Sequence, residues 1–444
     1  MNKRRLTNLQ IIAFGFFIIA VIGTGLLMLP ISSADGKATP FLTSLFTSVS
    51  ASCVTGLVLV DTATHWSLFG QLVILLMIQT GGLGFMSVAT FFLSFSKKNI
   101  NLRNRSIMAE SINFSHIAGL KNITRKIFIG TALFEGLGAF ILAVRFIPDF
   151  GIAKGIYYGI FHSVSAFCNA GFDLFGVFGE FSSLGSFTGD VVVNMTIITL
   201  ITVGGIGFLV WDDILRNKLN FRKYQLHTKI VLSVSFLLTF GGAVIFLVAE
   251  NNYSLAGLDA SEKILASLFS SVTCRTAGFN TVDFALLSRA GILFMCFLMY
   301  IGGSSGSTAG GVKTTSVFVI ISNVLSSIRG INRPRAFGRS FEEDAYKKAV
   351  TVCTFNLILI FAGVFLISFF DSFPTEDILF EVFSAMSTVG MTTGITRDLS
   401  VVSKLILIVL MYCGRVGSIS FALAILEKRE QPAVTYPVES IIIG

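Results

Sequence analysis

The chain has 444 residues, of which 53% are hydrophobic and only 13% are charged. Soluble globular domains carry about 25% charged residues, so this composition excludes a soluble enzyme of this length and indicates a polytopic membrane protein. The net charge of +8 requires no nucleic-acid partner, because positively charged loops on the cytoplasmic side of a membrane protein account for it.

Eight apolar segments are long enough to cross a bilayer, which takes roughly 20 residues. They lie at 9–30, 67–95, 123–147, 188–212, 229–249, 288–325, 346–370 and 401–426. The first follows a basic N-terminus and precedes Pro30 rather than a small-residue cleavage site, so we expect an uncleaved helix and not a signal peptide.

Four shorter apolar segments lie between alternate pairs of these spans. They occupy residues 40–52, 155–168, 262–274 and 375–388. A helix of about 13 residues covers only about 20 Å, which is too short to cross. Each is therefore either a re-entrant half-helix or an ordinary buried helix.

The distribution of charge predicts the topology. Most of the 33 Lys and Arg residues lie at the N-terminus, just after the last span, and in three linkers at about 96–122, 215–228 and 329–345. The other connections hold many of the acidic residues, which are Asp61, Asp173, Glu180, Asp259, Asp371, Glu376 and Asp377 among others. Because positive loops stay in the cytoplasm, we expect both termini and the three linkers inside, and every short helix on the outer side.

These features predict an all-α polytopic membrane protein in which helix, outer half-helix and helix are repeated four times. The repeats occupy residues 1–95, 123–214, 229–328 and 346–426, and a cytoplasmic tail follows at 427–444. Irregular backbone at membrane depth is tolerated only where it is buried or lines water. Four re-entrant loops in one chain can therefore converge around a single axis.

Each half-helix leads into a small-residue stretch that ends in glycine. The stretches read "SASCVTG" from Ser50, "SAFCNAG" from Ser165, "TCRTAG" from Thr273 and "TVGMTTG" from Thr388. Glycine accepts positive φ and leaves room for carbonyls to face inward, and a ring of carbonyl oxygens can replace the hydration shell of a monovalent cation. Aligned on the last glycine, the stretches predict a selectivity filter that holds K⁺ on backbone carbonyls. Its residues are Gly56, Gly171, Gly278 and Gly394, with Val54, Thr55, Asn169, Ala170, Thr276, Ala277, Thr392 and Thr393.

The direction of the half-helices favours a cation. Each precedes its glycine, so its C-terminal end, which carries partial negative charge, points inward. The filter stretches hold no carboxylate. Rings of charged side chains are the usual device where divalent cations are selected, so their absence from these stretches favours a monovalent ion. Arg275, beside the third stretch, is expected to support the filter loop through hydrogen bonds rather than to contact the ion.

The segment 288–328 is much longer than one crossing needs, and its middle consists almost entirely of Gly, Ser, Thr and Ala. A run of glycines in a helix, each costing up to about 1 kcal/mol relative to alanine, predicts a broken helix with an irregular loop inside the membrane.

Arg415 lies within an otherwise apolar span, where charged residues usually face a cavity or a partner. Glu135 is also within a span, and the sequence assigns it no role.

The chain resembles the Trk/Ktr/HKT superfamily of cation transporters, most closely the membrane subunits of bacterial Ktr potassium uptake systems. The resemblance runs from Leu9 to the C-terminus and is most specific in "TAGFNT" from Thr276 and "GGSSGSTAGGVKT" from Gly302. It implies four tandem M1–P–M2 units with pseudo-fourfold symmetry around one central pore, assembled as a homodimer in the bacterial cell membrane. None of the four stretches reads TVGYG, so strict discrimination of K⁺ from Na⁺ is not implied.

The resemblance also implies a gate below the filter, formed by the intramembrane loop 302–313 and an arginine facing the pore. The gate residues are then Gly302, Gly303, Ser304, Ser305, Gly306, Ser307, Thr308, Ala309, Gly310, Gly311 and Lys313, together with Arg415. Arg415 would act either as an electrostatic barrier or as a contact of the gate.

The chain lacks a Walker A motif, a dinucleotide-binding glycine motif and any cluster of His, Cys or acidic residues suited to catalysis, so we expect no enzyme and no cofactor. K⁺ is the expected transported ion, and the sequence leaves open whether Na⁺ is carried or only activates.

The resemblance implies a cytosolic ring of RCK-type, KtrA-like nucleotide-binding subunits as regulatory partner. The alternative is an alternating-access secondary transporter coupled to Na⁺ or H⁺, although such folds usually carry two inverted repeats rather than four in one orientation.

Overall fold

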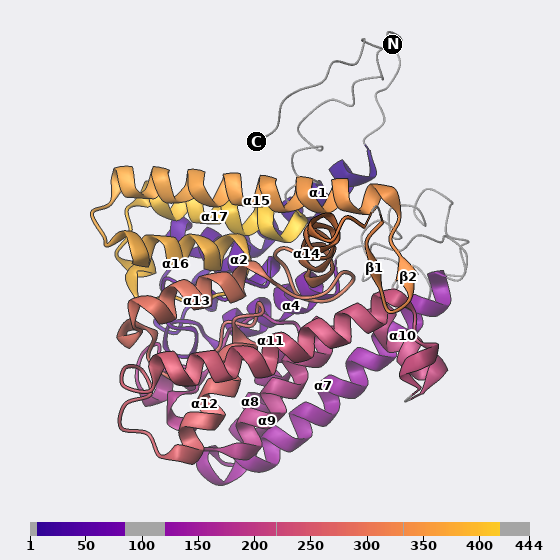
Figure 1. Cartoon of the computed structure of the whole chain (residues 1–444). Helices are drawn as coiled ribbons and strands as arrows, with labels where there is room; N and C mark the ends of the chain where they lie inside the picture. The colour runs from indigo at the N-terminus through magenta and orange to yellow at the C-terminus, as the bar shows by residue number, and fades with distance from the viewer. Residues whose placement is uncertain (1–6, 85–119, 219, 332, 418–444) are drawn as a thin grey trace, which may run out of the picture.

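The computed structural model describes residues 7–84, 120–218, 220–331 and 333–417 of the chain. The first helix of each repeat is the longest (Figure 1): α1 (Asn8–Leu27), α7 (Leu120–Phe150), α11 (Leu226–Glu250) and α15 (Glu343–Phe370). Within the described ranges these four are long and apolar enough to cross a membrane, and a fifth span is counted if α9 and α10 form one bent pair. The predicted all-α polytopic class with repeated M1–P–M2 units is confirmed.

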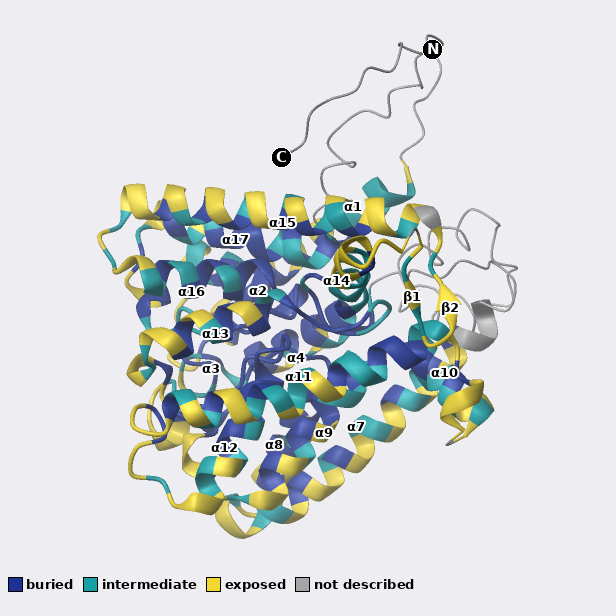
Figure 2. Cartoon of the chain, in the orientation of Figure 1, coloured by how far each residue is buried: buried dark blue, intermediate teal, exposed yellow. Residues whose placement is uncertain are grey.

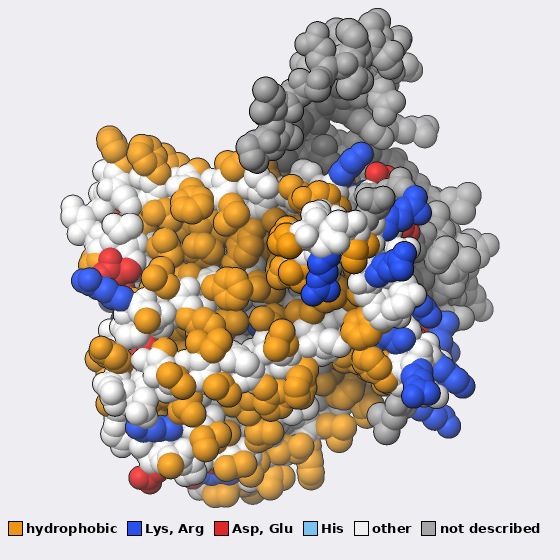
Figure 3. Space-filling view, viewed as in Figure 1, with side chains coloured by type: hydrophobic (Ala, Val, Ile, Leu, Met, Phe, Trp, Pro, Cys, Tyr) orange, Lys and Arg blue, Asp and Glu red, His pale blue; other side chains and the backbone are white. Residues whose placement is uncertain are grey.

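The outward faces of the long helices are apolar. Phe140 on α7, Phe236 on α11 and Phe365 on α15 are all exposed, and Figure 3 shows hydrophobic side chains covering the wall of the molecule. A helix that is apolar all round suits either a protein core or hydrocarbon. Because these side chains point away from the protein, the wall is the surface that faces lipid.

The short helices lie within three residues of their predicted bounds. They are α2 (Phe41–Ser52), α8 (Ile152–Phe167), α12 (Ala260–Thr273) and α16 (Thr375–Met386). Their C-terminal halves are almost completely buried, and the loops that follow them lie at the centre of the molecule (Figure 2). The fold therefore directs all four small-residue stretches inward.

The second helices of the repeats differ from the predicted spans. They are α4 (Leu68–Leu83), α9 (Val191–Gly205), α13 (Arg289–Tyr300) and α17 (Val401–Val416). The ends of the predicted spans at 85–95 and 418–426, the linker 96–119 and the tail 427–444 lie outside the described residues. The expectation of eight crossings stays a prediction.

Two of the second helices are interrupted. The break predicted in the third repeat is confirmed, since α13 is separated from α14 (Thr314–Ile328) by the loop at 301–313. The predicted span at 188–212 contains a break that the sequence analysis does not predict, because α9 meets α10 (Phe208–Asn217) at an angle of 95°. Gly207, with φ of 98°, makes the turn, and the N–H of Phe208 bonds to the carbonyl of Gly306 instead of continuing the helix.

The remaining elements are short. They are α3 (Thr62–His65), β1 (Arg335–Ala336), β2 (Arg339–Ser340), and the 3₁₀ helices η1 (Pro30–Ser32), η2 (Phe175–Phe178), η3 (Gly185–Phe187), η4 (Phe221–Lys223), η5 (Phe284–Leu286) and η6 (Ile395–Arg397). The two strands pair antiparallel, with Arg335 opposite Ser340, in a hairpin that the sequence analysis does not predict.

Carboxylates join the first and second helices in the last two repeats. Glu250, the last residue of α11, accepts the backbone N–H of Ser288 at 3.1 Å, and Ser288 caps the N-terminus of α13. Asp371, directly after α15, accepts the N–H of Ser400 at 3.1 Å, and Ser400 caps α17. Each carboxylate thus fixes the start of the helix that returns towards the centre.

His162 is a core residue that positions the second loop. Its Nδ1 lies 2.7 Å from the carbonyl oxygen of Tyr158, and its Nε2 accepts the N–H of Leu174 at 3.1 Å. The ring stacks on Phe175 with centroids 4.2 Å apart. With both ring nitrogens engaged, His162 is a satisfied structural histidine that holds the chain just after Gly171.

Candidate selectivity filter and gate

Four glycines meet at the centre of the molecule in cyclic order. A Cβ added to Gly56 would lie 2.5 Å from the carbonyl oxygen of Ala170, and one added to Gly171 would lie 2.6 Å from that of Ala277. A Cβ on Gly278 would collide with the carbonyl oxygen of Val389, and one on Gly390 with that of Thr55. Each glycine therefore faces the carbonyl that precedes the next glycine, and the fourth contact closes the ring.

The backbone repeats in all four loops. Two residues before each ring glycine, a non-glycine residue has positive φ: 52° at Val54, 58° at Asn169, 71° at Thr276 and 53° at Thr388. The four glycines have φ of 94°, 70°, 82° and 94° in the same order. Few non-glycine residues adopt this region, so four occurrences at one spacing mark equivalent positions.

The fourth corner of the ring is Gly390, and the prediction of Gly394 at this position is wrong. Thr392, Thr393 and Gly394 lie beyond the ring in a turn that leads to η6, where the N–H of Gly394 donates to Thr392 Oγ1 at 2.9 Å. The last corner is instead made by Thr388, Val389 and Gly390. The cause is that this stretch contains two glycines four residues apart, and the alignment used the second.

A serine before the ring would have identified the correct glycine. The N–H of Gly56 donates to Ser50 Oγ at 3.1 Å, and the N–H of Gly390 donates to Ser384 Oγ at 3.1 Å. Both serines lie six residues before their glycine, and Ser165 has the same spacing to Gly171. Gly278 has Val272 at this spacing, so the serine is shared by three of the four loops. Gly394 has Thr388 there, so the serine favours Gly390.

The loop at 301–313 packs against the residues that precede the ring glycines. A Cβ on Gly302 would lie 3.3 Å from Thr276 Cγ2, and one on Gly310 would collide with Thr388 Oγ1. Thr308 Oγ1 donates to the carbonyl oxygen of Phe167 and to Asn169 Oδ1, both at 3.1 Å. The loop thus contacts the second, third and fourth filter stretches at the residue two positions before each ring glycine, which is Asn169, Thr276 or Thr388.

The loop is also bound to the bend between α9 and α10. The N–H of Ser304 donates to the carbonyl of Gly205 at 2.9 Å, that of Thr308 donates to Gly204 at 3.2 Å, and Phe208 donates back to Gly306 at 2.8 Å. These backbone bonds join the second repeat to the third. The glycines of both segments permit this approach, since a Cβ on Gly207 would lie 2.8 Å from the carbonyl oxygen of Ser305.

Two cationic side chains hold the loop. Lys313 Nζ donates to the carbonyl oxygens of Ala309 at 2.8 Å and Gly310 at 3.2 Å. Arg415 donates through Nη1 to the carbonyl of Thr308 and through Nη2 to that of Gly82 at 2.9 Å, at the end of α4. Within the described ranges neither side chain forms an ion pair, so both place positive charge next to the loop.

Arg275 points away from the ring. Its Nη2 donates to Thr239 Oγ1 on α11 at 2.6 Å, and its own carbonyl oxygen accepts from Asn169 Nδ2 at 3.3 Å. The guanidinium therefore anchors the third filter stretch to the first helix of its repeat, an arrangement suited to support of the loop.

Glu135, which the sequence left without a role, joins three helices. Gln79 Nε2 on α4 donates to Glu135 Oε2 at 3.1 Å, and Ser163 Oγ on α8 donates to the backbone carbonyl of Glu135 at 2.7 Å. Cys168 Sγ lies 3.8 Å from Glu135 Oε1. The carboxyl group thus links the start of the second filter stretch to α4 and α7.

Comparison with known proteins assigns the chain to a family. The profile of the TrkH family, described as cation transport protein, matches residues 3–435. The potassium/sodium uptake protein NtpJ of Enterococcus hirae is 42% identical, with 100% of this chain and 98% of that protein covered. The Ktr system potassium uptake protein B of Bacillus subtilis is 38% identical, with 99% and 97% covered.

A solved structure shares the fold. The potassium transporter TrkH from Vibrio parahaemolyticus matches with a TM-score of 0.74 over 96% of this chain and 86% of that chain, at 14% sequence identity. This likeness concerns the fold alone, whereas the family match extends along nearly the whole sequence. The chain therefore belongs to the TrkH family of cation transport proteins.

Proposed function

We propose that this chain is the ion-translocating membrane subunit of a K⁺ uptake system, through which K⁺ moves down its electrochemical gradient. The observation that carries the proposal is the closed ring of Gly56, Gly171, Gly278 and Gly390. The names of its relatives agree, since one is a potassium/sodium uptake protein and another a Ktr system potassium uptake protein. As a member of a transporter family, the protein acts by moving ions rather than by catalysis.

The ring supplies carbonyl oxygens for a dehydrated cation. The carbonyls of Thr55, Ala170, Ala277 and Val389 each lie beside the glycine of a neighbouring repeat, as a ring around one axis requires. K⁺ would exchange its hydration shell for such oxygens. The C-terminal ends of α2, α8, α12 and α16 point towards the ring and add partial negative charge.

The loop 302–313 is the gate of the proposed pathway. It lies against the filter residues and is tied to α4, α9 and α17 by bonds from Arg415, Ser304 and Thr308. A cation leaving the ring would meet the loop and the charges of Lys313 and Arg415. Conduction therefore requires the loop to move away and these bonds to break.

The names of the relatives support a regulatory assembly of several components. Relatives named as Ktr system proteins belong to systems of several components. We place both termini in the cytoplasm of a bacterial cell, with a homodimer of this chain docked on a ring of RCK-type, KtrA-like subunits. The basic end of the molecule, with Arg222 and Lys223 exposed on η4, would face these subunits.

Na⁺ is the second ion that the proposal includes. The relative from Enterococcus hirae is named for both potassium and sodium uptake. Each loop of the ring contributes one glycine rather than the longer TVGYG signature, which provides fewer ordered carbonyl layers. An alternating-access transporter is not favoured, because its usual architecture has two inverted repeats.

Uptake into vesicles that contain the purified protein tests the proposal. We expect wild-type protein to take up K⁺ and Rb⁺ faster than Na⁺, and Gly278→Ser to bring the ratio of K⁺ to Na⁺ uptake towards one. A side chain at Gly278 would collide with the carbonyl of Val389 and strain a backbone with φ of 82°. Gly257→Ser is the matched control, because Gly257 has φ of 85° but no atom within 4 Å of the added Cβ. Unchanged selectivity in Gly278→Ser would contradict the filter.

A further inference from the structure

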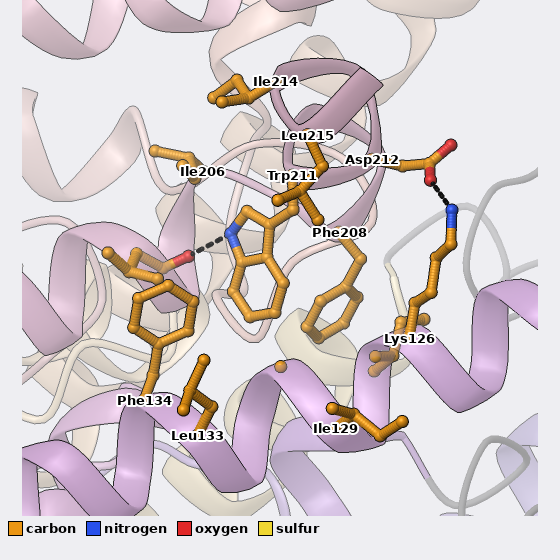
Figure 4. Close-up of a pocket in the computed structure, with 13 residues that line it drawn as sticks. Lys126, Ile129, Leu133, Phe134, Ile206, Phe208, Trp211, Asp212, Ile214 and Leu215 are labelled. Carbon is orange, nitrogen blue, oxygen red and sulfur yellow. Dashed lines mark hydrogen bonds and ion pairs between the residues drawn. The ribbon is translucent and has the colours of Figure 1, made fainter. Parts of the chain in front are cut away.

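An apolar pocket opens between α7 and the bend that joins α9 to α10 (Figure 4). Its volume is about 470 Å³, and Leu133, Phe134, Phe208 and Trp211 are among the residues that line it. Volumes of 300–1,000 Å³ are typical of small-molecule sites. Neither the filter nor the gate uses this pocket.

The pocket has a cationic edge. Lys126 Nζ lies 2.5 Å from Asp212 Oδ1, and Arg216 Nη2 lies 2.5 Å from Asp212 Oδ2. One carboxylate thus meets two cations, which leaves the edge with net positive charge. Lys126 and Arg216 keep 51% and 64% of their side chains exposed, so both can bind a further anionic group.

The apolar part of the pocket lies in the lipid-facing wall. Ile129 and Leu133, one turn apart on α7, are both 57% exposed, and Leu215 on α10 is 72% exposed. Water in such a hollow would find almost no hydrogen-bond partner, whereas a hydrocarbon chain would fill it at no such cost. The occupant that fits both parts has an acyl chain and an anionic head group.

We propose that this pocket binds an anionic phospholipid, with one acyl chain against Trp211 and Phe134 and the phosphate near Lys126 and Arg216. Basic pockets between membrane helices recognise anionic head groups in this way. The position agrees with the charge distribution, because α10, which contributes to the pocket lining, lies at the end of the molecule where Lys and Arg side chains gather (Figures 1 and 3).

The bound lipid would brace the segment that holds the gate loop. Trp211 Nε1 donates to the carbonyl of Val203 at 3.0 Å, which fixes the indole across the bend. On the other side of the bend, Phe208 and Gly205 are bonded to Gly306 and Ser304 of the loop. An acyl chain packed on Trp211 therefore supports the backbone to which the loop is attached.

Fluorescence of Trp211 tests the proposal without any transport measurement, so its failure is distinct from failure of the proposed function. The chain has two tryptophans, and Trp66→Phe removes the other, which is 1% exposed. The full-length Trp66→Phe variant is placed in phosphatidylcholine vesicles with increasing fractions of phosphatidylglycerol, where one of the two lipids carries bromine on its acyl chains. We expect brominated phosphatidylglycerol to quench Trp211 at about a fivefold lower mole fraction than brominated phosphatidylcholine, since a basic residue near the surface contributes about that factor.

Two further variants locate the head group. Lys126→Gln in the same background should remove most of the preference for phosphatidylglycerol, whereas Lys154→Gln, which changes an exposed lysine on α8 away from the pocket, should keep it. Native mass spectrometry of the wild-type protein should show retained phosphatidylglycerol. Because this protein carries no substitution, the measurement is independent of any effect of Trp66→Phe on folding. Equal quenching by both lipids would overturn the anionic preference. An absence of quenching by either lipid would mean that protein covers the pocket and would overturn the proposal.

Discussion

Asn169 is a residue at which the proposed filter and the proposed gate loop meet. Its Nδ2 donates to the carbonyl of Arg275 at 3.3 Å and lies 3.4 Å from Thr276 Oγ1, so it joins the second filter stretch to the third. Its Oδ1 accepts the hydroxyl of Thr308 at 3.1 Å. One side chain thereby connects two corners of the ring to the loop, and asparagine tolerates the positive φ that this position requires.

Thr308→Val should weaken the closed arrangement of the loop. The substitution keeps the shape of the side chain but removes the donor to Asn169 and Phe167, and an unsatisfied buried polar group costs about 1–3 kcal/mol. Uptake of Rb⁺ in the absence of any partner subunit is expected to rise by about tenfold, because 1.4 kcal/mol corresponds to one decade. The measurement is the initial rate of uptake into vesicles at equal protein content.

Thr196→Val is the matched control for this variant. Thr196 lies on α9, its hydroxyl donates to Val192 of the same helix at 2.7 Å, and it precedes Gly204 and Gly205, which bond to the loop, by about two helical turns. Its uptake should equal that of the wild-type protein. If Thr308→Val also leaves basal uptake unchanged, the hydroxyl does not hold the loop closed.

At the scale of elements, Arg415 connects the loop to two helices. It extends from α17 and donates to the carbonyl of Thr308 in the loop and to Gly82 at the end of α4. The planar guanidinium presents donors in fixed directions and can serve both acceptors at once, which an ammonium group cannot do in the same geometry. This favours a tether over a simple electrostatic barrier.

Arg415→Lys and Arg415→Gln separate these two roles. If Arg415 is a tether, both variants should raise basal Rb⁺ uptake, because neither side chain can bridge Thr308 and Gly82. The ratio of variant to wild-type uptake should be similar for the two substitutions. If charge alone closes the gate, Arg415→Lys would behave as wild type and only Arg415→Gln would leak. Thermal unfolding of each variant controls for loss of folded protein.

The elements differ in how well the sequence predicts them. The long helices and the half-helices follow from apolar length, and the broken third span follows from the run between Gly302 and Gly311. The bend after α9 could not be predicted in the same way, because hydropathy continues across it. The bend depends on bonds from Phe208 and Gly205 to a loop about 100 residues later, and such contacts leave no local signal.

In three loops the predicted glycine is the one that lies in the ring, because each of these loops has a single candidate glycine near its end. The fourth loop contains two candidate glycines, Gly390 and Gly394, and alignment on the last glycine selects Gly394. The packing of Gly390 against Thr55 and Gly56 of the first repeat identifies Gly390 as the ring residue, and the serine six residues before it is the sequence feature that agrees. The contacts of Asn169 and Glu135 likewise join residues of different repeats and become evident only in the fold.

At the scale of the whole molecule, each of the four repeats contributes one glycine to the ring. Each corner packs against a carbonyl of the next repeat, and the last repeat closes on the first. The gate loop, by contrast, comes from the third repeat alone and is held by residues of the others. The proposed filter is thus symmetric and the proposed gate asymmetric, an arrangement in which one loop would control a pathway shared by four repeats.

The most direct test of this account compares Gly390→Ser with Gly394→Ser in K⁺, Rb⁺ and Na⁺ uptake into vesicles. Both glycines have positive φ, of 94° and 109°, so both substitutions strain the backbone, but only a side chain at Gly390 would enter the ring. We predict that Gly390→Ser loses the preference for K⁺ over Na⁺ and that Gly394→Ser retains it. Loss of selectivity in Gly394→Ser with wild-type behaviour in Gly390→Ser would contradict the ring described here.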